Sequence, residues 1–207
     1  ADHLKNIIFK EVVALKLMDG FLIELKAVDV ADDTINELEE IFDNIADVNL
    51  LANYLAIPYA IKKRIFPKYQ NMSAPEIFAD LTRLSRVELD GEKPKIAFHT
   101  SNTDIVKTKD RQGHPDWFIS GTENSDLGVG KRAYAAESFS GLYKEKPVDY
   151  LYVVRVFGNQ GLYDANQGWH QAANFPIVDR LDLAEVLATV DELTEQYEDE
   201  LELLQVA

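Results

Sequence analysis

Residues 150–157 read Tyr-Leu-Tyr-Val-Val-Arg-Val-Phe, and this stretch decides how the second half of the chain is interpreted. It is composed almost entirely of β-branched and aromatic residues, which favour strands, and the predicted strand covers 148–157. Further strands are predicted at 95–99, 116–120, 132–136 and 176–178, separated by Gly-rich and polar loops. The sequence therefore predicts a mainly β region of about 90 residues after Asp90-Gly91.

The residues before this region contain a hairpin signal. Asp19-Gly20 separates the apolar runs 7–17 and 21–28, and Asp-Gly suits the positive φ angles of a type I′ turn. We therefore expect a β-hairpin centred on Asp19-Gly20. Its first arm stays open, because 7–17 is also compatible with a helix.

Helical patterns fill the rest of the first half. Thr34 with Glu37, and Ser73 with Glu76, are spaced as capping boxes that begin helices. Another helix is expected over 48–57, where Pro58 forces a boundary.

A long acidic helix is predicted at the end of the chain, over 182–204. Its apolar positions follow alternating spacings of four and three residues, interrupted by one threonine: Leu183, Leu187, Val190, Thr194, Tyr197, Leu201 and Leu204. This seam fits packing on the parent domain, and the alternative is a helix for self-association or for a partner.

These elements predict an α+β protein in two parts. Residues 1–90 form a mostly helical N-terminal half with a β-hairpin, and residues 91–207 form a β-rich C-terminal half closed by the long acidic helix.

Composition excludes several classes of protein. The 207 residues include no cysteine, which rules out disulfides, thiolate-zinc sites and cysteine nucleophiles. No apolar run approaches the length of a transmembrane helix, and the first ten residues do not form a signal peptide. We therefore expect a cytoplasmic protein that does not use a membrane.

The charge is strongly acidic and unevenly distributed. There are 36 acidic and 21 basic residues, for a net charge of −15. Residues 1–57 carry −8 and residues 179–207 carry −9, whereas residues 58–178 carry +2. Such a chain is repelled by phosphate backbones, so direct binding to nucleic acid is not expected. The acidic ends serve solubility or, alternatively, docking to a basic partner.

A small basic cluster stands out within the nearly neutral middle: Lys62, Lys63, Arg64 and Lys68. Its simplest interpretation is a solvated connector between helices. The alternative is an internal dock for one of the acidic ends.

Two short motifs are candidates for chemistry. His99-Thr100-Ser101 ends a predicted strand, where a sheet delivers side chains to its rim, and these groups can hydrogen-bond a ribose or a diphosphate. Residues 130–136, Gly-Lys-Arg-Ala-Tyr-Ala-Ala, bring a glycine and Tyr134 into a later strand. A P-loop, a Gly-x-Ser-x-Gly elbow and a helical His pair are all absent from the sequence.

The order of these pieces resembles an ADP-ribosyltransferase catalytic domain over residues 93–180. His99-Thr100-Ser101 resembles the first motif, although many family members have glycine where Thr100 stands. Residues 130–136 resemble the second motif. The strand at 150–157 and the turn that reaches Asp164 resemble the small rifamycin-modifying branch.

The resemblance implies a set of roles around NAD as substrate. His99 would hold the ribose with Thr100 and Ser101, Tyr134 would stack on the nicotinamide, and Asp164 would be the catalytic acid. The diphosphate would be met by Arg132, with Arg155 and Lys131 as alternatives. The acceptor of the ADP-ribose, a protein for example, is not specified. Each residue also has a structural interpretation: a capping histidine, a core tyrosine and a turn aspartate.

A second function is consistent with the acidic ends and the final helix. The chain would then be a non-enzymatic interaction protein, either an inhibitor or a mimic of nucleic acid, docking on a basic partner. A polar aromatic loop at 166–171, containing Trp169 and His170, is a candidate pocket rim, and Trp169 could equally fill the core.

Overall fold

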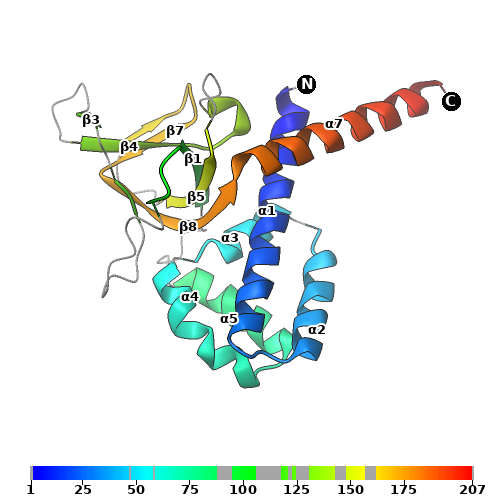
Figure 1. Cartoon of the computed structure of the whole chain (residues 1–207). Helices are drawn as coiled ribbons and strands as arrows, with labels where there is room; N and C mark the ends of the chain where they lie inside the picture. The colour runs from blue at the N-terminus through cyan, green and yellow to red at the C-terminus, as the bar shows by residue number, and fades with distance from the viewer. Residues whose placement is uncertain are drawn as a thin grey trace.

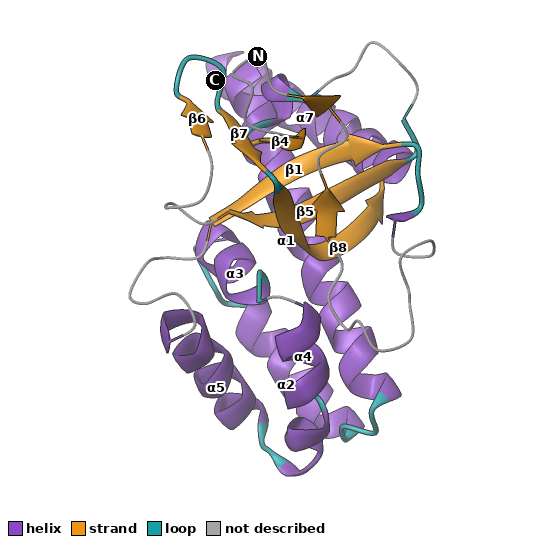
Figure 2. Ribbon diagram, turned by 90° about the vertical axis from the view of Figure 1, so that its left-hand side faces the viewer, coloured by secondary structure: helices purple, strands orange, loops and turns teal. Residues whose placement is uncertain are grey.

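The described chain combines a helical layer with an antiparallel sheet, and one long helix lies along both (Figure 1 and Figure 2). The computed structural model describes residues 2–46, 48–57, 59–87, 95–105, 118–120, 123–124, 131–142, 148–156 and 162–206. The predicted α+β class is confirmed, with a helical N-terminal half and a long C-terminal helix. None of the described helices combines the length and apolar character that a membrane span needs.

The first half is helical: α1 (Asp2–Ala27), α2 (Asp32–Asp43), α3 (Val48–Leu55), α4 (Tyr59–Ile65), the 3₁₀ helix η1 (Pro67–Asn71) and α5 (Ala74–Val87). The capping box at α5 is confirmed, because Glu76 Oε2 accepts from Ser73 N at 2.8 Å and from Ser73 Oγ at 2.9 Å. The box at Thr34 is wrong. Helix α2 begins two residues earlier, after Ala31, and without a side-chain cap.

The predicted β-hairpin is wrong, because α1 continues through Asp19-Gly20. Apolar residues that recur every three or four positions, including two adjacent pairs, form its buried side: Ile8, Phe9, Val12, Val13, Leu17, Phe21 and Leu25. Gly20 serves a close approach rather than a turn, since a Cβ there would lie 3.3 Å from Asp179 Oδ2. This contact explains a glycine inside a helix, where it costs about 1 kcal/mol relative to alanine.

The second half forms the sheet: β1 (Lys95–Ser101), β2 (Phe118–Ser120), β3 (Glu123–Asn124), β4 (Lys131–Ala136), β5 (Tyr150–Val156), β6 (Leu162–Asp164), β7 (Trp169–Ala172) and β8 (Asn174–Asp182). The strand order is β2-β8-β5-β1-β4-β7-β6, and β3 pairs with β4. Each predicted strand is found in its described part. Strands β3, β6 and β7 were not predicted.

The two halves share one hydrophobic core on the sheet face that meets the helices. The outer part of α1 packs Phe9 against Phe98 of β1, with ring centroids 4.9 Å apart. Its other end packs Phe21 against Phe42 and Phe66 of the helical layer. A smaller cluster, built on β1, β2, β4, β5, β7 and β8, lies on the opposite face.

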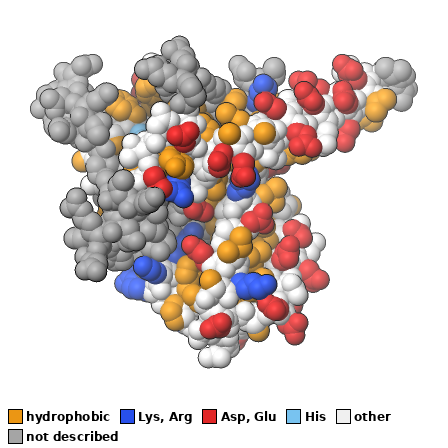
Figure 3. Space-filling model, in the orientation of Figure 1, with side chains coloured by type: hydrophobic (Ala, Val, Ile, Leu, Met, Phe, Trp, Pro, Cys, Tyr) orange, Lys and Arg blue, Asp and Glu red, His pale blue; other side chains and the backbone are white. Residues whose placement is uncertain are grey.

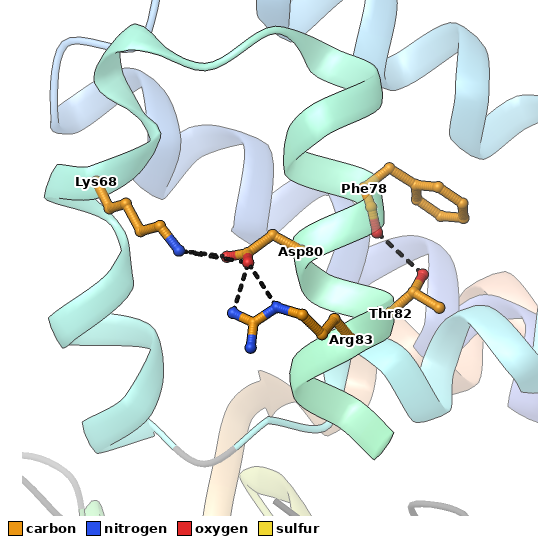
Figure 4. A network of polar contacts seen from close by, with 5 residues as sticks. All are labelled: Lys68, Phe78, Asp80, Thr82 and Arg83. Carbon is orange, nitrogen blue, oxygen red and sulfur yellow. Dashed lines mark hydrogen bonds and ion pairs between the residues drawn. The ribbon is translucent and has the colours of Figure 1, made fainter. Parts of the chain in front are cut away.

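A polar network joins η1 to α5 (Figure 4). The side chain of Asp80 is only 8% exposed and accepts from Lys68 Nζ at 3.3 Å and from Arg83 Nη2 at 2.7 Å. Burial alone would raise the pKa of Asp80, but the bonds and charges of Arg83 and Lys68 hold it below its ordinary value. Lys68 of the basic cluster therefore joins two helices.

Lys62 of the same cluster is buried between the helices and the sheet, so it is not part of a solvated connector. It is 4% exposed, and the nearby charges are Glu24 of α1 and Asp179 of β8. Burial lowers the pKa of Lys62, and both carboxylates oppose that change. Burial likewise raises the pKa of Glu24 and of Asp179, and Lys62 opposes it. Lys62 therefore stabilises both carboxylates, which repel each other, at the junction of α1, α4 and β8.

We predict that Lys62→Met lowers the free energy of unfolding at neutral pH by about 2 kcal/mol, because two half-buried carboxylates lose their cation. The carboxyl pKa values of Glu24 and Asp179 are higher in the folded chain than in the unfolded chain. The stabilisation that these groups give is therefore complete below about pH 4 and is lost as the pH rises through their pKa values in the folded chain. Removing Lys62 raises these values further. The deficit relative to the wild type should therefore be smaller at pH 4.5 than at pH 7.

Urea unfolding of both proteins at the two pH values measures this difference. Lys63→Met is the matched control, because Lys63 is the exposed neighbour on the same helix. An equal deficit at both pH values would contradict the assigned role of Lys62.

Helix α7 (Leu183–Val206) leaves the sheet directly after β8. Asp182 Oδ1 accepts from Glu185 N at 3.0 Å at its start. Its first turns pack on α1 through Leu183, Val186 and Val190, as the parent-domain interpretation predicted. The remainder projects from the body (Figure 1).

Candidate functional site

A cavity of about 160 Å³ lies on the helix-facing side of the sheet, beside β1, β4 and β7. Nine residues line it: Phe98, His99, Thr100, Tyr134, Ala135, Ala136, Gly141, Leu142 and Trp169. Among the described residues, one residue pair joins β1 to β4, Phe98 with Ala136. Beyond that pair the two strands are no longer paired with each other, and His99, Thr100 and Tyr134 border the cavity.

His99 and Tyr134, which are 35 residues apart, meet at this cavity. His99 Nδ1 lies 2.6 Å from the carbonyl oxygen of Tyr134. Because a carbonyl only accepts, Nδ1 carries the proton, and Nε2 of the neutral ring keeps a lone pair. Burial lowers the pKa of His99, and the bond to Tyr134 opposes that shift. The ring is therefore a neutral hydrogen-bond acceptor near pH 7.

The aromatic wall of the cavity is formed by Tyr134 and Trp169. Their ring centroids are 6.0 Å apart, with an interplanar angle of 73°. Trp169 is held by its own Nε1, which donates to the carbonyl of Gly141 at 3.1 Å. A Cβ at Gly141 would lie 3.1 Å from that nitrogen, so this position accommodates little more than glycine. Trp169 is thus a fixed cavity wall, as the pocket-rim interpretation of its loop proposed.

The three predicted cofactor-binding residues differ in position. Thr100 lines the cavity, whereas Ser101 Oγ accepts from Thr103 N at 3.1 Å and closes the turn after β1. Arg132 is two residues before Tyr134, so strand alternation places both on one face of β4. Arg132 Nε is buried and has no hydrogen-bond partner among the described residues. A buried donor without a partner is costly, and an anionic ligand would satisfy it.

Asp164, the predicted acid, lies one strand beyond the cavity wall. It pairs with Trp169, which pairs with Ala136, and paired residues share a face of the sheet. Asp164 therefore lies on the cavity side of β6, but it does not line the cavity. Its Oδ1 accepts from Asn166 N at 2.9 Å and from Gln167 N at 3.3 Å, as a turn aspartate does. No carboxylate is found among the described residues that line the cavity.

A second carboxylate, Glu137, follows β4 directly and is tightly held. It lies 2.7 Å from His170 Nε2 and accepts from Tyr163 Oη at 3.0 Å. The rings of Tyr163 and His170 are stacked at 4.6 Å. Since Glu137 is adjacent to Ala136 in the chain, strand alternation places it on the opposite side from the cavity. This cluster fastens β6 and β7 to the end of β4.

The sequence did not indicate that Gly141 and Leu142 line the cavity. Gly141 belongs to the 3₁₀ helix η2 (Phe139–Gly141), and Leu142 follows it. The contribution of η2 depends on β7, which was not predicted, because Gly141 supports Trp169. Gly130, which begins the second motif, lies outside the described residues.

Comparisons with known proteins do not assign this site. No protein-family model matches the chain, and neither a curated protein nor a solved structure matches it. The function is therefore argued from the geometry of the cavity.

We predict that His99 titrates below the ordinary histidine pKa of about 6.5 and holds its neutral proton on Nδ1. Burial disfavours the imidazolium form, and the carbonyl of Tyr134 fixes the tautomer. The ring nitrogen shifts in an NMR titration measure both properties, and the spectrum of His99→Ala assigns the signals. A pKa above 6.5, or a proton on Nε2, would contradict this geometry.

Proposed function

We propose that the chain binds NAD in the cavity beside β1 and β4 and transfers its ADP-ribose to an acceptor. The observation that carries this proposal is the meeting of His99 and Tyr134 at one cavity. These residues come from the two motifs that resemble ADP-ribosyltransferases. A cytoplasmic location, where NAD is available, is part of the proposal.

The cavity suits the nicotinamide end of NAD in size and in wall chemistry. An apolar cavity of about 150 Å³ is large enough for benzene, so about 160 Å³ accommodates a six-membered ring. Tyr134 and Trp169 provide aromatic surface, and Phe98 and Leu142 complete an apolar lining. A planar amide-bearing ring is therefore a better fit than a phosphate or a sugar alone.

The polar groups fit the rest of the substrate. The neutral His99 ring and the Thr100 hydroxyl can accept and donate hydrogen bonds to the ribose hydroxyls. Arg132 has a buried Nε that a diphosphate oxygen would satisfy. These three residues come from neighbouring strands, so one extended ligand can contact them together.

In the reaction, the bond between the ribose carbon and the nicotinamide nitrogen breaks, and nicotinamide leaves. An acceptor nucleophile then bonds to that carbon and loses its proton. Positive charge develops on the ribose during this step, and a carboxylate stabilises it. We assign this role to Asp164, which lies on the cavity face one strand beyond Trp169.

We predict that the chain binds NAD in a calorimetric titration and that His99→Ala or Tyr134→Ala weakens binding by about tenfold or more. This corresponds to the loss of one hydrogen bond or stacking contact in a buried site. His3→Ala is the matched control, because His3 is an exposed histidine on α1. Wild-type protein that gives no heat at millimolar NAD would refute the proposal.

We predict that Asp164→Asn slows release of nicotinamide from NAD by about a hundredfold, because removing electrostatic stabilisation of a transition state has effects of this order. NAD binding should be retained. Glu192→Gln is the control, since that carboxylate is exposed on α7 and away from the cavity, and its rate should match the wild type. Equal rates for Asp164→Asn and the wild type would remove Asp164 from the mechanism and leave NAD binding as the function.

A further inference from the structure

The outer part of α7 is the described segment that is least supported by the rest of the chain. Leu183, Val186, Val190 and Thr194 are buried, whereas every residue from 195 to 205 is exposed. Figure 1 shows this part projecting from the body, and Figure 3 shows acidic side chains along it. We call residues 195–206 the outer segment.

The outer segment has little intrinsic reason to be helical. Helices shorter than about 12–15 residues are marginal in water without tertiary packing. It contains five acidic residues and no lysine or arginine. Pairs such as Glu195 with Asp199, and Glu198 with Glu202, are spaced four apart and repel one another. Negative charge is also unfavourable near the C-terminal end of a helix, and its last turn has no basic residue.

An apolar stripe nevertheless continues along the outer segment. Tyr197, Leu201 and Leu204 keep the heptad spacing of the packed part and are 47%, 48% and 74% exposed. In this heptad they occupy the a and d positions, which form the seam. Glu198 and Glu200 occupy the flanking e and g positions, whose charges determine which helix can pair with the seam. The exposed seam is therefore bordered by acids on both sides.

The packed part of α7 shows what kind of helix covers this pattern. There α1 supplies apolar residues to the seam and a lysine to an acidic flanking position, since Lys5 Nζ lies 3.9 Å from Asp191 Oδ1. Lys16 Nζ lies 3.5 Å from Oε2 of Glu185, an acid outside the flanking positions of this heptad. Helix α1 begins at Asp2, and the outer segment extends beyond what it covers.

We propose that the outer segment docks an amphipathic helix of another protein, with apolar seam residues and lysine or arginine at its flanking positions. Such a helix would repeat the chemistry that α1 supplies to the packed part. A second copy of α7 is disfavoured as the occupant, because acids at both flanking positions would meet acids. This surface is separate from the cavity, so the proposal does not depend on NAD binding.

The test uses two labelled synthetic helices of about three heptads, with the same leucine seam. One carries lysine at the flanking positions, and the other carries glutamate. Fluorescence anisotropy follows the binding of each helix to the full chain at low and at high salt. We expect the lysine helix to bind, salt to weaken that binding, and the glutamate helix not to bind.

The variant Leu201→Glu with Leu204→Glu should weaken binding of the lysine helix by about tenfold or more, because the seam supplies the apolar contact. Ile23→Glu is the control, since Ile23 is 69% exposed on α1 away from the seam. The control adds one acidic charge and the double variant adds two. Added negative charge would by itself strengthen attraction of the lysine helix, so weaker binding by the double variant indicates loss of the apolar seam.

Three results would overturn the proposal. The lysine helix could fail to bind, or it could bind the double variant as tightly as the wild type, which would indicate charge alone. Analytical ultracentrifugation could also show a dimer of the full chain that the double variant converts to a monomer. In that case the second copy, not a basic helix, is the occupant.

Discussion

The rest of the structure depends on the packing of one side of α1 against both layers. Phe9 contacts Phe98 of the sheet and Phe139 of η2, and Phe21 contacts the helical layer at the other end of the same helix. Asn6 Oδ1 also accepts from Phe139 N at 3.0 Å. Because a single helix makes all these contacts, the helical half and the sheet cannot lose their packing independently.

The shape of the cavity depends on the contacts between α1 and η2. Asn6 and Phe9 of α1 hold η2, and the carbonyl of Gly141 in η2 holds the indole of Trp169. Trp169 in turn forms the aromatic wall of the cavity together with Tyr134. A cavity wall supported through three elements is preorganised, since each group is fixed by packing before a ligand arrives. The helical half is thus part of the site's support, although none of its residues lines the cavity.

The sequence could predict those helices and strands whose local residue pattern matches the environment that they have in the folded chain. The β-branched run at 150–156 became the buried strand β5, and Ser73 with Glu76 forms the cap of α5. It failed at Asp19-Gly20, where the glycine leaves room for the close approach of Asp179 from a strand 159 residues later. It also missed β7, because Trp169-His170-Gln171 has no strand pattern until it pairs with β4. The motifs carrying His99 and Tyr134 were visible, but the bond that joins them depends on tertiary structure.

The acidic residues of the chain have different physical roles at different places in the structure. Glu24 and Asp179 lie beside the buried Lys62, so their charges help join α1, α4 and β8. Asp80 is enclosed by Lys68 and Arg83 and acts within the helical layer. Asp191 and Glu185 meet lysines of α1 at the surface, where each pair contributes little. The acids of the outer segment border an exposed apolar stripe. Net charge alone therefore indicates neither solubility nor recognition, because the same residue type has each role according to what lies beside it.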